Sequence, residues 1–183
     1  MDSLYGLVLA FFLTVGVLLA AGCTGDNTPS PVDGGVPEPD VLIQNTGNVT
    51  GQGVILPGVP RGTIDTITFT IGLAPGAKTV DLNNMSIVYT DAVRTESFLP
   101  VGGYRGNPPP GYWGIVETIH EVGAPNIRMD FEEQFVIRIN PRAAVVPNQV
   151  IMISVKPAAS KPMVLRRYAP STITEGDNLL LVL

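Results

Sequence analysis

The sequence predicts a mainly β protein, an antiparallel β-sandwich preceded by one N-terminal hydrophobic α-helix. Three observations lead to this expectation. Apolar and polar residues alternate in several short segments, Gly (20) and Pro (17) are abundant among 183 residues, and an uncharged apolar run lies near the start. Alternation with a period of two is the pattern of a strand with one buried face, whereas frequent glycine and proline mark turns.

The clearest strand signal is DTITFTIGL, residues 65–73, in which Ile67, Phe69 and Ile71 alternate with threonines. The same alternation recurs over 135–139 and 151–155. Several short strands separated by turn signals predict a β-sandwich of the immunoglobulin-like type. Shorter candidate strands are 86–90, 113–119, 164–168 and 179–182, and turn signals lie at 74–76, 83–84, 140–141 and 156–157.

The N-terminal apolar run extends from Leu4 to Gly22 and carries no charge. As a helix it would be about 28 Å long, close to the bilayer core of about 30 Å. It shows no polar face, which an ordinary helix of a soluble domain would have. Residues 1–23 are therefore expected to form a hydrophobic helix or signal-like segment that meets the membrane.

Two interpretations of this segment come from its ends. A cleaved secretory signal usually begins with basic residues, but the start MDS carries Asp2 and no lysine or arginine. The stretch Ala20-Ala21-Gly22-Cys23 looks like a lipobox, in which small residues admit a peptidase and the cysteine thiolate takes the lipid. Cys23, the only cysteine, is a candidate lipidation site.

A linker follows over residues 24–48, and a β-sandwich domain is expected over residues 49–183. Residues 24–40, TGDNTPSPVDGGVPEPD, are almost wholly glycine, proline, serine, threonine and acidic residues. Such a segment cannot bury enough apolar surface to offset its ordering entropy, and its prolines favour an extended chain. It is expected to hold the domain away from a surface.

Composition excludes several classes of function. The net charge of −5 argues against nucleic-acid binding, which needs a basic face. The one histidine, His120, stands far from Cys23, so a zinc site lacks ligands. No serine lies in a G-x-S-x-G motif, and no phosphate-binding loop is present. The sequence therefore predicts a protein that is not an enzyme and needs no cofactor.

Two local features leave alternatives open. Asp130, Glu132 and Glu133 predict either a calcium site or an exposed strand edge. In GYRGNPPPGYWG, residues 103–114, Tyr104, Tyr112 and Trp113 surround three prolines. These aromatic residues suit a contact with sugar or a neighbouring subunit, or Trp113 begins a strand and fills the core.

Two tripeptides, Asn48-Val49-Thr50 and Asn84-Met85-Ser86, are candidate N-glycosylation sites if the domain lies outside the cell. Residues 138–167 carry six basic residues and no acidic one. Folding would place this block either on a basic face that meets an acidic face of another subunit, or on a solvated strand face beside ordinary acidic residues. The six are Arg138, Arg142, Lys156, Lys161, Arg166 and Arg167.

Beyond these features, an ordered series of segments resembles the archaellins, the filament subunits of the archaeal flagellum. FTIGLAPGAKTVDLNNMSIVYTD, Phe69–Asp91, is similar to a strand, turn and strand of their outer domain. FEEQFVIRI, Phe131–Ile139, is similar to their strand before the last hairpin, and PNQVIMISVKPAASKPMVLRRYAP, Pro147–Pro170, to their closing segment. The similarity covers roughly Gly51 to Leu183.

The resemblance implies a structural subunit, major or minor, of an archaellum-type or type IV pilus-like extracellular filament. Its partners would be copies of itself or other archaellin-like subunits, with the membrane as a partner before assembly and no nucleic acid. Archaellin precursors are cut at a glycine before the hydrophobic helix, and Gly6 is the matching candidate, although Tyr5 replaces the usual basic residue. The residues expected to pack in the filament core or membrane are Leu7, Leu9, Phe11, Phe12, Val15, Gly16, Leu18 and Leu19.

The chain departs from the archaellin pattern in the length of its hydrophobic helix. The apolar run stops at Gly22, and Pro29 and Pro31 follow, whereas archaellin helices continue further. The alternative is therefore a lipid-anchored archaeal surface lipoprotein in which an archaellin-like domain serves binding or adhesion. Both interpretations place the domain at the surface of an archaeal cell.

Overall fold

The computed structural model describes residues 39–58, 61–158 and 160–183, which form strands joined by turns and loops. The expected N-terminal helix and most of the expected linker lie outside the described residues. The strands are β1 (Ile43–Asn45), β2 (Thr50–Val54), β3 (Thr63–Leu73), β4 (Val80–Asp81), β5 (Ser86–Thr90), β6 (Thr95–Arg105), β7 (Tyr112–Ile119), β8 (Arg128–Met129), β9 (Gln134–Asn140), β10 (Val150–Lys156), β11 (Met163–Tyr168), β12 (Gly176–Leu179) and β13 (Leu181–Val182).

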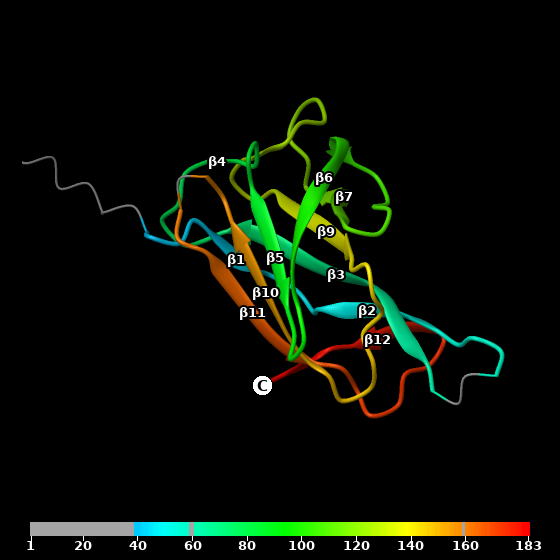
Figure 1. Cartoon of the computed structure of the whole chain (residues 1–183). Coiled ribbons are helices and arrows are strands. Elements are labelled where there is room, and N and C mark those ends of the chain that lie inside the picture. Colours follow the sequence, from blue (N-terminus) through cyan, green and yellow to red (C-terminus); the bar gives the residue numbers. More distant parts are fainter. Residues whose placement is uncertain (1–38, 59–60, 159) are drawn as a thin grey trace, which may run out of the picture. The chain divides into compact units, whose positions relative to one another are not determined.

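The strands form one continuous eleven-stranded sheet that folds over on itself into two layers, with β4 and β8 as a separate pair. One layer, here called the β3 layer, contains β12, β2, β3, β9 and β7 in that order, with β1 also paired to β3. The other, the β10 layer, contains β5, β10, β11 and β13. Figure 1 shows β5, β10 and β11 side by side, with β3 and β9 running behind them.

Strand β6 joins the two layers along one side of the sandwich. Its first half pairs antiparallel with β5, where Thr95 faces Thr90 and Phe98 faces Ile87. Its second half pairs parallel with β7, beginning with Leu99 opposite Tyr112. One long strand therefore satisfies main-chain groups in both layers, and neither layer is left with a free edge here.

The C-terminal segment joins the layers along the other side. Strand β12 pairs with β2, and β13 pairs with β11 two residues further along the chain. Between them Leu180 is buried, and its amide donates a hydrogen bond of 2.9 Å to the Val49 carbonyl oxygen. The fold is thus a sandwich that nearly closes into a barrel.

The core lies between the two layers and consists of the inward residues of the alternating strands. Ile67, Phe69 and Ile71 of β3 are fully buried, as the sequence pattern predicted. Ile137 of β9 and Ile153 of β10 are also fully buried. Burying an aliphatic or aromatic side chain contributes about 1.5–3 kcal/mol, so this core stabilises the association of the layers.

The predicted mainly β character of the domain is confirmed, and the candidate strands of the sequence correspond to β3, β5, β7, β9, β10, β11 and the β12–β13 segment. The structure also differs from the sequence-based expectations. The β6–β7 pair is parallel, so the sheet is not wholly antiparallel. In addition, one continuous sheet forms both layers. Strand β6 was not expected, because Pro100, Gly102 and Gly103 interrupt its alternation. Residues 43–45 of the expected linker form β1, and Ile43 is buried in the core.

We expect Leu180→Ala to lower the free energy of unfolding by about 2–5 kcal/mol, because it removes buried methyl groups and leaves a cavity where the two layers meet. The measurement is chemical denaturation of the full chain in detergent, followed by the fluorescence of Trp113, the single and fully buried tryptophan. Leu183→Ala, at an exposed position, is the control and should change stability by less than about 0.5 kcal/mol. Equal effects of the two substitutions would contradict the closing role of Leu180.

Candidate interaction surface

The outward side of the β10 layer and of the first half of β6 is an apolar and hydroxyl-bearing surface, called here the β10 face. Its residues alternate with the core residues of the same strands, so they face solvent. Register brings them into rows, with Val150 opposite Tyr168 and Tyr168 opposite Leu181. The apolar members of the β10 face are Val88, Leu99, Val150, Met152, Val164, Tyr168 and Leu181.

The remaining positions of the β10 face carry hydroxyl groups or positive charge, and its only charged residues are Lys156 and Arg166. None of the outward residues of its strands in the described part of the chain is acidic. A solvated sheet face usually intersperses charges of both signs. The hydroxyl-bearing members are Ser86, Thr90, Thr95, Ser97 and Ser154.

A shallow hollow of about 260 Å³ lies on this face, lined in part by Thr90, Val150, Met152 and Arg166. The exposed fraction is 50% for Val150 and 48% for Val164, which is high for valines within a sheet. Exposed apolar surface of this kind marks protein–protein contacts more often than surface open to water. The arrangement suits the binding of a macromolecular surface and offers no group for covalent chemistry.

The turn between β5 and β6 fixes one border of the β10 face through the buried carboxylate of Asp91. Its Oδ1 accepts hydrogen bonds from the amides of Val93 (2.9 Å) and Arg94 (3.0 Å). Its Oδ2 accepts one from the Tyr89 hydroxyl at 2.9 Å and one from the Gln149 side chain at 2.8 Å. The Arg94 Nε lies 3.1 Å from the same oxygen.

These hydrogen-bond and ion-pair partners determine the direction in which the pKa of Asp91 is shifted. Burial alone would raise the pKa of Asp91, but the hydrogen bonds from Val93, Tyr89 and Arg94 and the charge of Arg94 outweigh burial and lower that pKa. Burial raises the pKa of Tyr89 well above its usual value. Asp91 is therefore a structural anion that holds the turn, and its charge is already satisfied within the chain.

The opposite side of the molecule, the outward side of the β3 layer, differs in character. Thr50, Thr68 and Arg138 lie side by side across β2, β3 and β9. The Arg138 guanidinium donates hydrogen bonds to Thr68 Oγ1 (3.1 Å) and Asn107 Oδ1 (2.6 Å). This part of the surface is polar and already hydrogen-bonded.

Towards β12 the same side becomes acidic. Asp177 is exposed on β12 opposite Gln52, and Asp65 is exposed at the irregular step between β2 and β3. Leu179, also on β12, is 48% exposed. No ion pair in the described part of the chain involves either carboxylate. This region, defined by Asp65, Asp177 and Leu179, is called here the β12 patch.

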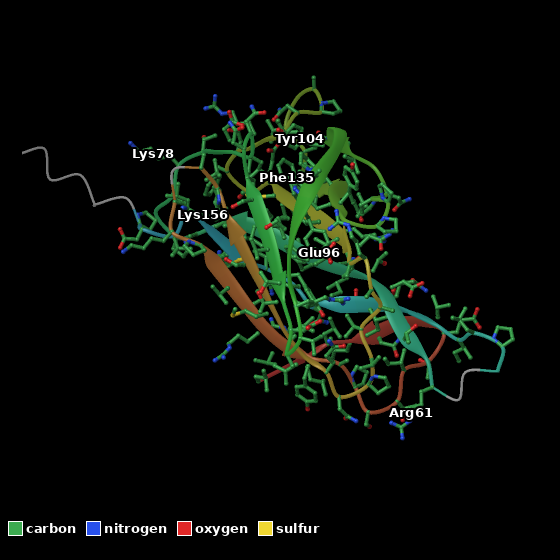
Figure 2. All side chains as sticks on the ribbon, in the orientation of Figure 1. Arg61, Lys78, Glu96, Tyr104, Phe135 and Lys156 are labelled. Carbon is green, nitrogen blue, oxygen red and sulfur yellow. The ribbon has the colours of Figure 1, made fainter. Side chains whose placement is uncertain are left out.

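The six basic residues noted in the sequence are not all on one face. Arg142 pairs with the buried Glu96 at 2.8 Å, and Lys161 pairs with Asp40. Arg138 belongs to the β3 layer, whereas Lys156 and Arg166 lie on the β10 face. Arg167 lies opposite Ile151 on β11, is half-buried and donates a hydrogen bond of 2.8 Å to the Arg166 carbonyl oxygen. Figure 2 shows Lys156 and Arg61, which is outside the basic block, at opposite ends of the domain. The basic block therefore supplies two cations to the β10 face.

Both predicted glycosylation sites are sterically accessible. Asn48 is exposed just before β2, and Asn84 is exposed in the turn before β5 with φ of 61°. In both tripeptides the middle residue, Val49 or Met85, is buried. Occupancy remains a prediction.

The aromatic loop resolves in favour of a core role for Trp113. The indole is fully buried, and the Tyr104 ring lies edge-on to it with ring centroids 5.7 Å apart. Pro110 and Gly111 form a turn, closed by a hydrogen bond of 3.1 Å from the Tyr112 amide to the Pro109 carbonyl oxygen, and the loop returns the chain so that β7 can pair parallel with β6. Gly111, with φ of 86°, ends this return, and a Cβ there would lie 2.4 Å from the Arg142 side chain.

The acidic triplet before β9 has a structural role. The Glu133 carboxylate is buried and accepts hydrogen bonds from the amides of Val122 (2.6 Å) and Asp130 (3.0 Å). His120 is exposed directly after β7. Within the described ranges, no three His, Cys, Asp or Glu side chains are grouped to hold a metal ion.

The candidate residues Gly6 and Cys23, and the expected core helix from Leu7 to Leu19, lie outside the described residues. Among residues 39–58, 61–158 and 160–183, no helix has the length and apolar character needed to cross a membrane.

Sequence reasoning missed the β10 face and the Asp91 turn. A signal for the face was present, because residues 86–90, 95–99 and 150–156 combine apolar residues with serine and threonine, and Glu96 is the only acidic residue among them. The Asp91 network joins residues 89 to 149, and its partners could not be identified without the register of β5 against β10.

The fold resembles solved structures of archaeal filament proteins. The crystal structure of archaeal flagellin FlaB1 from Methanocaldococcus jannaschii matches with a TM-score of 0.57 at 15% identity, covering 75% of this chain and 95% of that one. The archaeal flagellum of Methanospirillum hungatei strain JF1 matches with a TM-score of 0.51 at 12% identity, covering 76% and 71%. No protein-family model and no curated protein matches the sequence. The described domain therefore has an archaellin-like fold, as the sequence resemblance implied.

We expect Asp91→Asn to lower the free energy of unfolding by about 1–3 kcal/mol at pH 7, because the buried network loses its negative charge and one of the two oxygens that accept hydrogen bonds. The folded pKa of Asp91 is lowered from the ordinary value of 3.8, so its stabilisation is complete above that value and disappears as the pH falls through the folded pKa. Denaturation of the full chain in detergent at pH 7 and near pH 2 should show the difference between variant and wild type shrinking in acid. A difference that stays constant over this range would contradict the ionised role.

Glycan occupancy is tested by intact mass of the protein taken from its native cells. If both tripeptides are used, Asn48→Gln and Asn84→Gln should each remove the mass of one glycan, because each asparagine is exposed. Asn83→Gln, beside Asn84 and not in a tripeptide of this kind, is the control and should leave the mass of the glycan in place. Identical masses for wild type and both variants, after allowance for the substitution, would show that neither site is used.

Proposed function

We propose that this chain is a structural subunit of an archaellum-type extracellular filament, with the hydrophobic segment in the filament core and the β domain outside. The observation that carries the proposal is the archaellin-like fold joined to an uncharged apolar segment. The β10 face supports it, because a filament subunit must present surface that contacts other subunits. The partners would be copies of itself or other archaellin-like subunits at the surface of an archaeal cell.

The hydrophobic segment would associate with the membrane before assembly and with other helices afterwards. Its leucines, valines and phenylalanines supply apolar packing, and Gly16 permits close approach of helices. No catalytic step enters this function.

A second candidate is a lipid-anchored surface lipoprotein in which the domain serves binding or adhesion. The observation that favours it is the stretch Ala20-Ala21-Gly22-Cys23 followed by a proline-rich spacer. In that case the chain would be cut before Cys23 and would lose its helix.

Intact mass and N-terminal peptide mapping of the protein from cells should distinguish the two. We expect the mature chain to retain residues 7–22 and to carry no lipid on Cys23, because the filament needs the helix. Electron microscopy of the cell surface should then show filaments that contain this protein. A chain beginning at a lipid-modified Cys23 would overturn the filament and support the lipoprotein.

A further inference from the structure

We propose that the β10 face binds the β12 patch of a second copy of this chain, in a head-to-tail contact that repeats from subunit to subunit. This inference rests on the filament proposed above and identifies the surfaces by which its outer domains meet. It is argued from the exposure, the charge and the relative placement of the two surfaces.

The β10 face has the composition of a surface that becomes buried. Val150 and Val164 are about half exposed, and no carboxylate lies among the outward residues of the described β10-layer strands. Its two cations have no ion-pair partner within the described residues. The nearest acidic residue in the hollow, Asp91, is buried and already bound by Arg94.

When a contact excludes water from this surface, its cations need carboxylate partners, because an unpaired buried charge is strongly destabilising. Two copies meeting through their β10 faces would bring the cations of both together without an acidic residue between them. A self-complementary dimer through this face is therefore disfavoured, and the complement must be a different, acidic surface.

The β12 patch provides that complement. Asp65 and Asp177 are exposed and have no ion-pair partner in the described ranges, and Leu179, two residues after Asp177 on β12, adds an exposed apolar side chain. The patch lies on the outward side of the β3 layer, whereas the β10 face is the outward side of the other layer. A contact between opposite sides of the same domain leaves one free surface at each end and so continues into a chain.

Each variant is tested as the full chain, produced in the native cells in place of the wild-type chain. Arg166→Glu should reduce the mass of filaments sheared from the cells at least tenfold, because it opposes Asp177 with a like charge. Adding Asp177→Lys to Arg166→Glu should restore filaments to within about threefold of wild type. Arg61→Glu is the matched control, since Arg61 is exposed, lies off the β10 face and undergoes the same change of charge; it should cause no loss.

Folding is checked separately by the thermal transition of each variant in detergent. The Arg166 side chain is exposed and makes no hydrogen bond or ion pair with the described residues, so folding should be unchanged. Filaments unaffected by Arg166→Glu would overturn the proposed contact while leaving the filament function intact. Loss without rescue by Asp177→Lys would overturn the β12 patch as the partner. A wild-type chain that builds no filaments would overturn the function and the contact together.

Cysteine cross-linking gives a second measurement that does not depend on charge. Val164→Cys and Leu179→Cys in one chain should give a ladder of disulfide-linked oligomers in filaments, whereas either substitution alone should give no ladder. Peptide mapping of the linked oligomers identifies the cysteines in each disulfide, so that bridges through Cys23 are recognised and left out. Dimers of the single Val164→Cys chain through residue 164 would indicate a self-complementary contact and would overturn the proposal.

Discussion

Main-chain hydrogen bonding along the two open sides of the sandwich is the constraint on which the rest of the structure depends. Strand β6 bonds to β5 and then to β7, and the β12–β13 segment bonds to β2 and then to β11. A sandwich without such segments would expose unpaired strand edges, which pair readily with other chains. With these sides closed, contacts with other molecules are left to the side chains on the outward faces. A domain rich in strands is thereby protected from edge-to-edge aggregation.

The closure also explains the division of polar residues. Buried anions serve the loops: Glu133 receives the amides of Val122 and Asp130, and Asp91 receives those of Val93 and Arg94. Each carboxylate replaces backbone partners that a strand would have supplied, so the connections stay ordered around the core. Because these anions are satisfied internally, the carboxylates left for intermolecular contacts are exposed ones such as Asp177.

A strand could be predicted from the sequence where its pattern is local, and could not where its pattern depends on pairing with distant residues. Strands β3, β9 and β10 have one face in the core, so their alternation is local and visible in the sequence. Strand β6 crosses from one layer to the other, and Pro100, Gly102 and Gly103 lie where the pairing partner changes, so its pattern is not that of a simple half-buried strand. The parallel β6–β7 pairing and the return through the three prolines depend on long-range register. The basic block was visible, but its separation into paired and unpaired cations required the positions of Glu96 and Asp40.

Whether each of the six basic residues has a partner within its own chain matters more for contacts with other molecules than the net charge does. Arg142 and Lys161 are engaged by carboxylates of their own chain, and Arg138 is engaged by Thr68 and Asn107. Individually exposed ion pairs contribute only about 0–1 kcal/mol, so such charges add little to affinity by themselves. Arg166 differs because Met152 lies opposite it and Val164 and Tyr168 flank it on β11. These side chains would exclude water in a contact, which strengthens the attraction of Arg166 to a carboxylate and penalises any partner without one. The apolar residues of the β10 face would then supply affinity, and Arg166 would determine which surface of the neighbour is accepted and in which direction the subunits are arranged.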